Sequence, residues 1–289
     1  MDSVGKNAKI WILIALLFLL VWIVRLVPNS LERFYNIIFI DWNFYYREVV
    51  GGWMYSLATV GLISRFFGVI IGIATLFLSW KRKNLFEIRK WVATALFLES
   101  LYYLLLFPSP IWLLALGPTS NVYVTLAISY ILQIIFTVPF LLLLAVKLFK
   151  TEVESFDKKV LKWAGVAFAA YIIALWSNSV LRWVDMILTE GIQFLFSGII
   201  SIGALNALVF MSFAVLFAII GAYSLVRHKD TVRRWIALSL LMVGLHYTIF
   251  LVYSYMTNSL NSVWLVDIWT IPLIGLGLVT LKVKKTNSS

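Results

Sequence analysis

The chain has 289 residues, of which 62% are hydrophobic and only 13% are charged, and its mean hydropathy is +0.96. Soluble domains are about half apolar and about a quarter charged, so this composition excludes an ordinary water-soluble protein. The chain has no cysteine, which excludes disulfides, iron–sulfur clusters, thiolate zinc sites and a cysteine nucleophile within it. Its net charge of +11 lies in the loops of a membrane protein, so we expect no nucleic-acid partner.

Apolar runs near the length of about 20 residues that a bilayer crossing requires follow one another along the chain. The first, residues 9–27, has a basic start and no small-residue cleavage site, which favours an uncleaved anchor over a signal peptide. The others lie at 53–80, 91–107, 122–146, 163–180, 203–225, 235–256 and 262–281. We therefore predict an all-α, polytopic integral membrane protein with about eight transmembrane helices.

The basic residues predict the orientation of these helices. The loops 81–90, 147–162 and 226–234, together with both tails, hold 19 of the 24 Lys and Arg residues. Because Lys and Arg collect in cytoplasmic loops, both termini are predicted to be cytoplasmic in a cell-membrane protein. Besides the lipid bilayer, we expect that a membrane or cytoplasmic protein partner could dock on these basic loops.

Sequence matches at a nearly constant offset indicate an internal duplication. Residues 29–34 align with 178–183, 70–72 with 219–221 and, after a five-residue difference in a cytoplasmic loop, 89–93 with 233–237. Thr137 and Pro139 recur as Thr270 and Pro272. An even number of helices per unit gives both units the same orientation, so we predict two tandem parallel four-helix repeats, residues 1–150 and 151–289.

Each predicted repeat carries an external segment between its first two helices, at 31–50 and 181–200. In the second segment the polar residues recur every three or four positions, which predicts an amphipathic helix. They are Arg182, Asp185, Thr189, Gln193 and Ser197. We expect both segments to lie in the outer membrane interface and favour a structural cap over a substrate vestibule.

Four ionisable residues break the symmetry between the repeats: Arg65, Glu99, His246 and Asp267. Under the repeat alignment their counterparts are the uncharged residues Ala214, Val243, Tyr102 and Leu126. A charge at bilayer depth costs several kcal/mol unless it is paired or hydrated, so such residues are the first candidates for a functional site.

His246 and Asp267 are predicted to lie at similar depth, because the turn between their helices falls midway between them. A carboxylate beside an imidazole would make a proton-sensitive or proton-carrying pair. The alternatives are a hydrogen-bonded clamp between helices or an Asp267 that reaches the lipid headgroups.

The predicted depths of Arg65 and Glu99 in the membrane agree less well when they are counted from Trp80 and Trp91. At 1.5 Å per residue their axial offset is about 10 Å, which long side chains or water would have to bridge. One interpretation is a polar path that includes Tyr102 and Tyr103 next to Glu99. The alternative is a structural ion pair that fixes helix register.

Thr137 with Pro139, and Thr270 with Pro272, predict a kink at corresponding places in two helices. Proline frees a backbone carbonyl and threonine can satisfy backbone groups, so the kinks could be hinges or ligand sites. The alternative is that they only shape helix packing.

No motif of a membrane enzyme occurs: there is no glycine-rich phosphate loop, HExxH, GxSG, GxGD or DDxxD. With only two histidines, His228 and His246, a bis-histidine haem or a histidine-rich metal site cannot form within one chain. We therefore expect no catalytic residues, metal or cofactor.

The leading functional hypothesis is a transport or channel-type membrane protein, with a polar path formed by the four ionisable residues between the repeats. One alternative is a membrane-anchor subunit of a larger complex, including a quinone-binding respiratory subunit. Another is a lipid-interacting or assembly protein that moves no solute.

Overall fold

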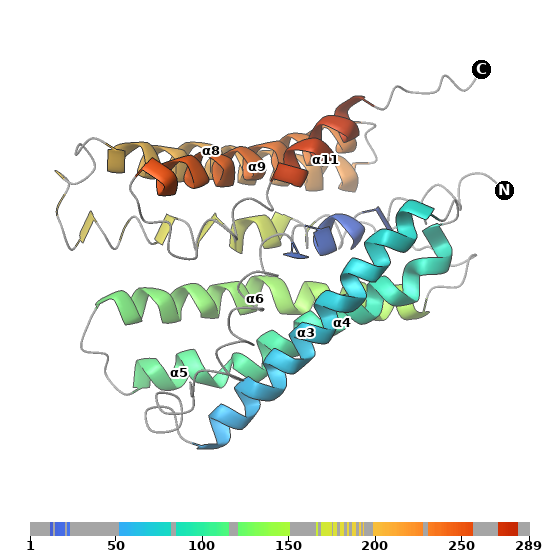
Figure 1. Cartoon of the computed structure of the whole chain (residues 1–289), viewed down its shortest axis with the longest axis horizontal. Coiled ribbons are helices and arrows are strands. Elements are labelled where there is room, and N and C mark those ends of the chain that lie inside the picture. Colours follow the sequence, from blue (N-terminus) through green and yellow to red (C-terminus); the bar gives the residue numbers. More distant parts are fainter. Residues whose placement is uncertain are drawn as a thin grey trace. The chain divides into compact units, whose positions relative to one another are not determined.

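The described part of the chain is almost entirely helical in the computed structural model (Figure 1). It comprises residues 52–81, 85–115, 121–150, 199–227, 231–256 and 271–282, with scattered residues at 12–23 and 166–193. Five of its helices are long and apolar enough to cross a membrane. The class of all-helical membrane protein that the composition predicts is therefore supported.

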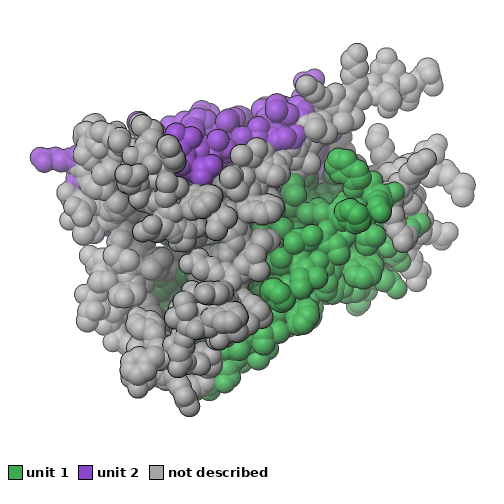
Figure 2. All heavy atoms as spheres, viewed as in Figure 1, with its two compact units in different colours: residues 1–185 green, residues 186–289 purple. Residues whose placement is uncertain are grey.

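The chain divides into two compact units, Met1–Asp185 and Met186–Ser289 (Figure 2). Unit 1 includes the apolar run 163–180, which the repeat prediction assigns to the second half. The repeat boundary at 150 stays a prediction, and each unit is described by itself.

Unit 1 is built on a helical hairpin with a third long helix against it. Its elements are α3 (Gly52–Lys81), η1 (Leu85–Ile88), α4 (Arg89–Leu106), α5 (Pro108–Ala115) and α6 (Asn121–Lys150). The central helix α4 packs against both α3 and α6, and α5 packs against α6. The three long helices lie within a few residues of the predicted spans, except that α6 continues four residues further.

The short helix α5 was not predicted from the sequence. Pro108 has no backbone N–H and so interrupts the hydrogen bonding of α4, but proline is well suited to the first position of a new helix. The apolar residues after it were too few to be recognised as a span.

Unit 2 repeats the order of packing, with α9 (Val232–Met256) between α8 (Ile199–Val226) and α11 (Ile271–Lys282). The helices α8 and α9 correspond to the predicted spans 203–225 and 235–256. The last predicted span began at residue 262, and its first part lies outside the described residues.

The outward faces of the long helices are apolar. In α3 the exposed apolar residues form a stripe with spacings of three and four: Val60, Ile63, Phe67, Ile70 and Ile73. Trp80, at the end of α3, is 92% exposed, as is typical of an interfacial aromatic anchor. An apolar stripe of this length on a helix of 30 residues suits contact with lipid rather than water.

Residues 15–19 of the first predicted span are helical and buried in succession, from Ala15 to Leu19. Five consecutive residues point to every side of a helix, so this segment is enclosed all round. Its Phe18 meets Tyr171 edge to face, with ring centroids 5.5 Å apart. The predicted interfacial segment 31–50 and most of 181–200 lie outside the described residues.

Glycine allows α9 and α11 to approach closely. A Cβ on Gly277 would lie 2.6 Å from Leu241 Cγ and 3.1 Å from the carbonyl oxygen of Ala237. On the other side of the contact, a Cβ on Gly244 would lie 2.7 Å from Ile274 Cγ1. Small residues at such positions let membrane helices pack backbone to backbone.

Gly277→Ala is expected to lower the free energy of unfolding by about 1–3 kcal/mol, because the new methyl group overlaps α9. Gly275→Ala is the matched control, since no described atom lies within 4 Å of a Cβ built there. It should raise the free energy of unfolding by up to about 1 kcal/mol through helix propensity. Unfolding in mixed micelles, followed by tryptophan fluorescence, measures both; equal effects would contradict the described packing.

Candidate functional site

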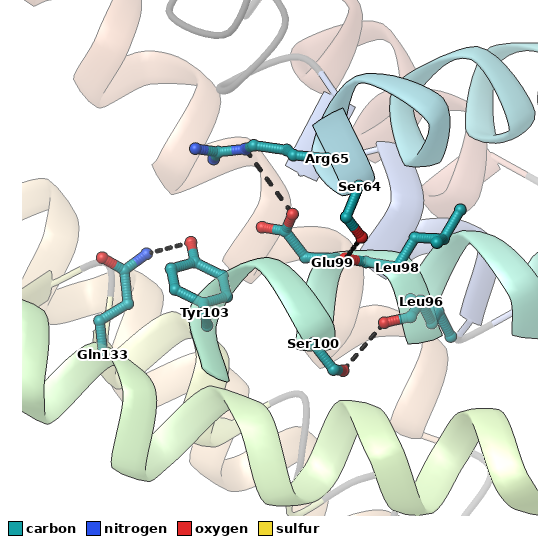
Figure 3. Close-up of polar contacts among 8 residues, drawn as sticks. All are labelled: Ser64, Arg65, Leu96, Leu98, Glu99, Ser100, Tyr103 and Gln133. Carbon is teal, nitrogen blue, oxygen red and sulfur yellow. Dashed lines mark hydrogen bonds and ion pairs between the residues drawn. The ribbon is translucent and has the colours of Figure 1, made fainter. Parts of the chain in front are cut away.

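Two charged side chains of the first hairpin, formed by α3 and α4, meet in the interior of unit 1. Arg65 on α3 and Glu99 on α4 form an ion pair, with 3.7 Å between Arg65 Nε and Glu99 Oε2 (Figure 3). Their side chains are only 4% and 2% exposed. The depth offset of about 10 Å estimated from the sequence at 1.5 Å per residue was therefore wrong.

The helical turn η1 explains the difference. The sequence estimate placed Trp80 and Trp91 at equal depth, but η1 adds four residues before α4, and at about 2 Å per residue they add about 8 Å. Counted in this way, Arg65 lies about 24 Å from the end of α3 and Glu99 about 23 Å from Leu85. The hydroxyl of Ser64 donates to the carbonyl of Leu98 at 2.9 Å and fixes this register.

Arg65 has a second partner in an aromatic ring. Its Cζ lies 4.1 Å from the ring centroid of Tyr102 and 6.0 Å from that of Tyr103. The two tyrosine rings are themselves in edge contact, 5.1 Å apart. A guanidinium over a desolvated aromatic face gains about 2 kcal/mol, so Tyr102 holds Arg65 independently of the carboxylate.

The carboxyl group of Glu99 faces hydrogen-bond donors. The side chains of Trp22 and Tyr103 come close enough to interact with it. Within the described part of the chain, however, neither carboxyl oxygen has a hydrogen bond of full geometry. The carboxylate is thus buried and oriented, but incompletely satisfied.

Tyr103 connects this pair to α6. The amide Nε2 of Gln133 donates to the hydroxyl oxygen of Tyr103 at 2.7 Å, and Figure 3 shows the two side chains pointing toward each other. Gln133 is itself buried. We call Trp22, Arg65, Glu99, Tyr102, Tyr103 and Gln133 the Glu99 cluster.

Two members of the cluster, Trp22 and Gln133, were missed by sequence reasoning. A search for charges overlooks a neutral amide, although Gln133 lies in an otherwise apolar helix, where a polar side chain needs a partner. Trp22 lies well inside the first predicted span rather than at its end, which sets it apart from the interfacial tryptophans.

Thr137 lies one helical turn from Gln133 on the same face of α6 and is buried. Its hydroxyl has no hydrogen-bond partner among the residues that the structure describes. The helix continues through Pro139, which is exposed, and the predicted kink stays a prediction. Pro272 lies in α11, whereas Thr270 falls outside the described residues.

His246 is buried in α9 of unit 2. Its backbone carbonyl accepts a hydrogen bond of 2.8 Å from Asn206 Nδ2 on α8. Its ring makes an edge contact with that of Tyr247, with centroids 4.9 Å apart. Asp267 lies outside the described residues, so its predicted pairing with His246 stays a prediction.

No family model matches the chain, and neither a curated protein nor a solved structure does so. Within the described ranges, no three histidine or acidic side chains come together as a metal site would require. The function therefore has to be argued from the chemistry of the Glu99 cluster.

Proposed function

We propose that this chain is a multi-pass membrane protein of transport or channel type, in which the Glu99 cluster is the polar part of the path. The observation that carries the proposal is the ion pair between Arg65 and Glu99, buried among apolar membrane-type helices. Charges at this depth are costly, and membrane proteins keep them chiefly in substrate paths, ion paths and proton relays.

The geometry favours this role over a purely structural clamp. A buried ion pair stabilises a fold well only when its remaining hydrogen-bonding capacity is filled. Here the pair is joined through Arg65 Nε at 3.7 Å, which is longer than a hydrogen bond. Both oxygens of Glu99 retain capacity within the described residues, as a site that exchanges partners requires.

For the architecture we propose eight spans arranged as two tandem parallel four-helix repeats. The burial of the central helices supports this. Every residue from 90 to 102 in α4 falls in the same class, buried or not buried, as its counterpart from 234 to 246 in α9. In α3 and α8 the agreement is partial: Gly72 and Thr75 are buried like their counterparts Gly221 and Ser224, whereas Ser64 is buried and its counterpart Phe213 is exposed. The agreement between α4 and α9 supports the proposed repeat, and the sequence matches supply the register.

The comparison of the two hairpins also bears on the ion pair. The counterparts of Arg65 and Glu99 are Ala214 and Val243, and both are completely buried. The second hairpin therefore packs with apolar residues at these two positions. If the hairpins share an origin, folding alone does not require the charged pair, and function is the better reason for its presence.

Both termini are proposed to be cytoplasmic, because the helix ends on one side of unit 1 are basic. These ends are Lys81 of α3, Arg89 of α4 and Lys150 of α6. Positive charge at the ends of membrane spans marks the cytoplasmic side. The same surface is our candidate for docking of a protein partner.

Glu99→Gln and Arg65→Ala are each expected to reduce flux to the level of empty liposomes, because each removes one charge of the path. Proteoliposomes that contain the full chain would be assayed with protons, inorganic ions and small polar solutes. The matched control is Thr94→Ala, since this exposed hydroxyl on α4 bonds, among the described residues, to the carbonyl of Lys90 in its own helix. Flux in both charge variants equal to that of the control would contradict a transport path through the cluster.

A further inference from the structure

The surroundings of Glu99 suit both protonation forms of its carboxyl group. The ionised form faces the guanidinium of Arg65 and two possible donors, Trp22 and Tyr103. It is nevertheless incompletely satisfied, because no described group completes a hydrogen bond to either oxygen. Taking up a proton would therefore break few contacts and would remove a buried negative charge.

Arg65 would remain held when Glu99 becomes neutral. The face of Tyr102 lies 4.1 Å from Arg65 Cζ and interacts with the cation whatever the state of the carboxyl group. Because Arg65 has this second partner, the carboxylate of Glu99 can lose its charge without releasing the arginine.

Tyr103 can serve both forms, because a hydroxyl group donates and accepts. It can donate to the carboxylate and accept from the protonated acid. The amide of Gln133 holds its oxygen in place at 2.7 Å, with one acceptor position left open. Trp22, by contrast, can only donate through its indole and therefore favours the ionised form.

The remaining neighbours leave Glu99 as the group that titrates. Of the described charged and titratable side chains, Arg65 of α3 and Tyr103 of α4 face Glu99, and Tyr102 and Tyr171 lie beside Tyr103. The described contribution of α6 is the neutral amide of Gln133, which bonds to Tyr103, and that of the first segment is Trp22. No second carboxylate faces Glu99 within these elements.

An alkaline-earth cation fits this site poorly. Alkaline-earth ions take several oxygen ligands, and the cluster offers one carboxylate beside a fixed positive charge. A proton is held by a covalent bond to one oxygen and so tolerates a guanidinium nearby.

We propose that Glu99 binds and releases a proton, and that H⁺ is the species moved or coupled at the Glu99 cluster. The inference deepens the proposed transport function and rests on it. In the step itself one O–H bond forms on the carboxylate, and the charge of the pair changes from zero to +1. On release that bond breaks and the neutral pair is restored.

The test is infrared difference spectroscopy of the full chain in lipid nanodiscs as the pH is changed. The carbonyl stretch of a protonated carboxylic acid should appear as the pH falls and should shift in heavy water. Glu99→Gln should abolish this band, whereas Glu87→Gln, at an exposed carboxyl in η1, should leave it unchanged. Tyr103→Phe should retain the band at a shifted frequency, which assigns it to Glu99 without removing the carboxyl group.

The spectra are independent of any transport assay. A band that titrates and depends on Glu99 supports proton exchange even where proteoliposomes show no flux, an outcome that would contradict only the proposed transport. A spectrum in which no titrating band depends on Glu99 or Tyr103 would overturn the inference, even if a solute other than H⁺ is transported.

Discussion

Glu99→Gln is expected to lower the free energy of unfolding by about 1–3 kcal/mol, because the buried guanidinium of Arg65 loses its counter-ion but keeps its contact with the ring of Tyr102. Arg65→Met should cost more, about 3–5 kcal/mol, since it leaves a buried carboxylate without a counter-charge. The double variant should be more stable than either single variant, because no unpaired charge remains at the site. Equilibrium unfolding in bicelles, with all four proteins compared as a double-mutant cycle, measures this coupling.

Ser239→Ala provides the control for the cycle. The hydroxyl of Ser239 donates to the carbonyl of Ala214 at 2.8 Å, within unit 2. Its removal should cost about 1 kcal/mol and should add to the cost of Glu99→Gln. A double variant of Arg65 and Glu99 that costs the sum of its single variants would contradict the buried ion pair.

Most of the described fold could be predicted from apolar runs alone. The helices α3, α4, α6, α8 and α9 are continuous stretches of apolar residues, and in a bilayer every backbone polar group must be satisfied within the segment. Element ends were less predictable. The helix α5 depends on two prolines at 108 and 110, and its eight residues are too few for a span.

The candidate site could be predicted only in part. The charges of Arg65 and Glu99 stand out in apolar helices, so their selection required no structure. Their contact depends on the turn η1, whose four residues look like an ordinary cytoplasmic loop in the sequence. Gln133 and Trp22 come from other helices, and no sequence pattern indicates that they lie beside a hairpin formed by α3 and α4.

The most direct test of the central claim is to exchange the two charges, as Arg65→Glu with Glu99→Arg. The exchanged pair keeps one positive and one negative group on the same two helices. An arginine at position 99 can also reach the rings of Tyr102 and Tyr103, which lie three and four residues along α4. We therefore expect the exchanged protein to be more stable than either single variant.

The flux through the exchanged protein distinguishes a functional site from a structural clamp. In the exchanged protein the carboxylate lies on α3, at position 65. The side chains of Trp22 and Tyr103 approach position 99, so they no longer face a carboxylate. The measurement is proteoliposome flux of the exchanged protein beside its stability in the same lipids. We predict recovered stability with flux no greater than that of empty liposomes. Recovery of both stability and flux would contradict a functional role for this arrangement and would make the pair a structural clamp.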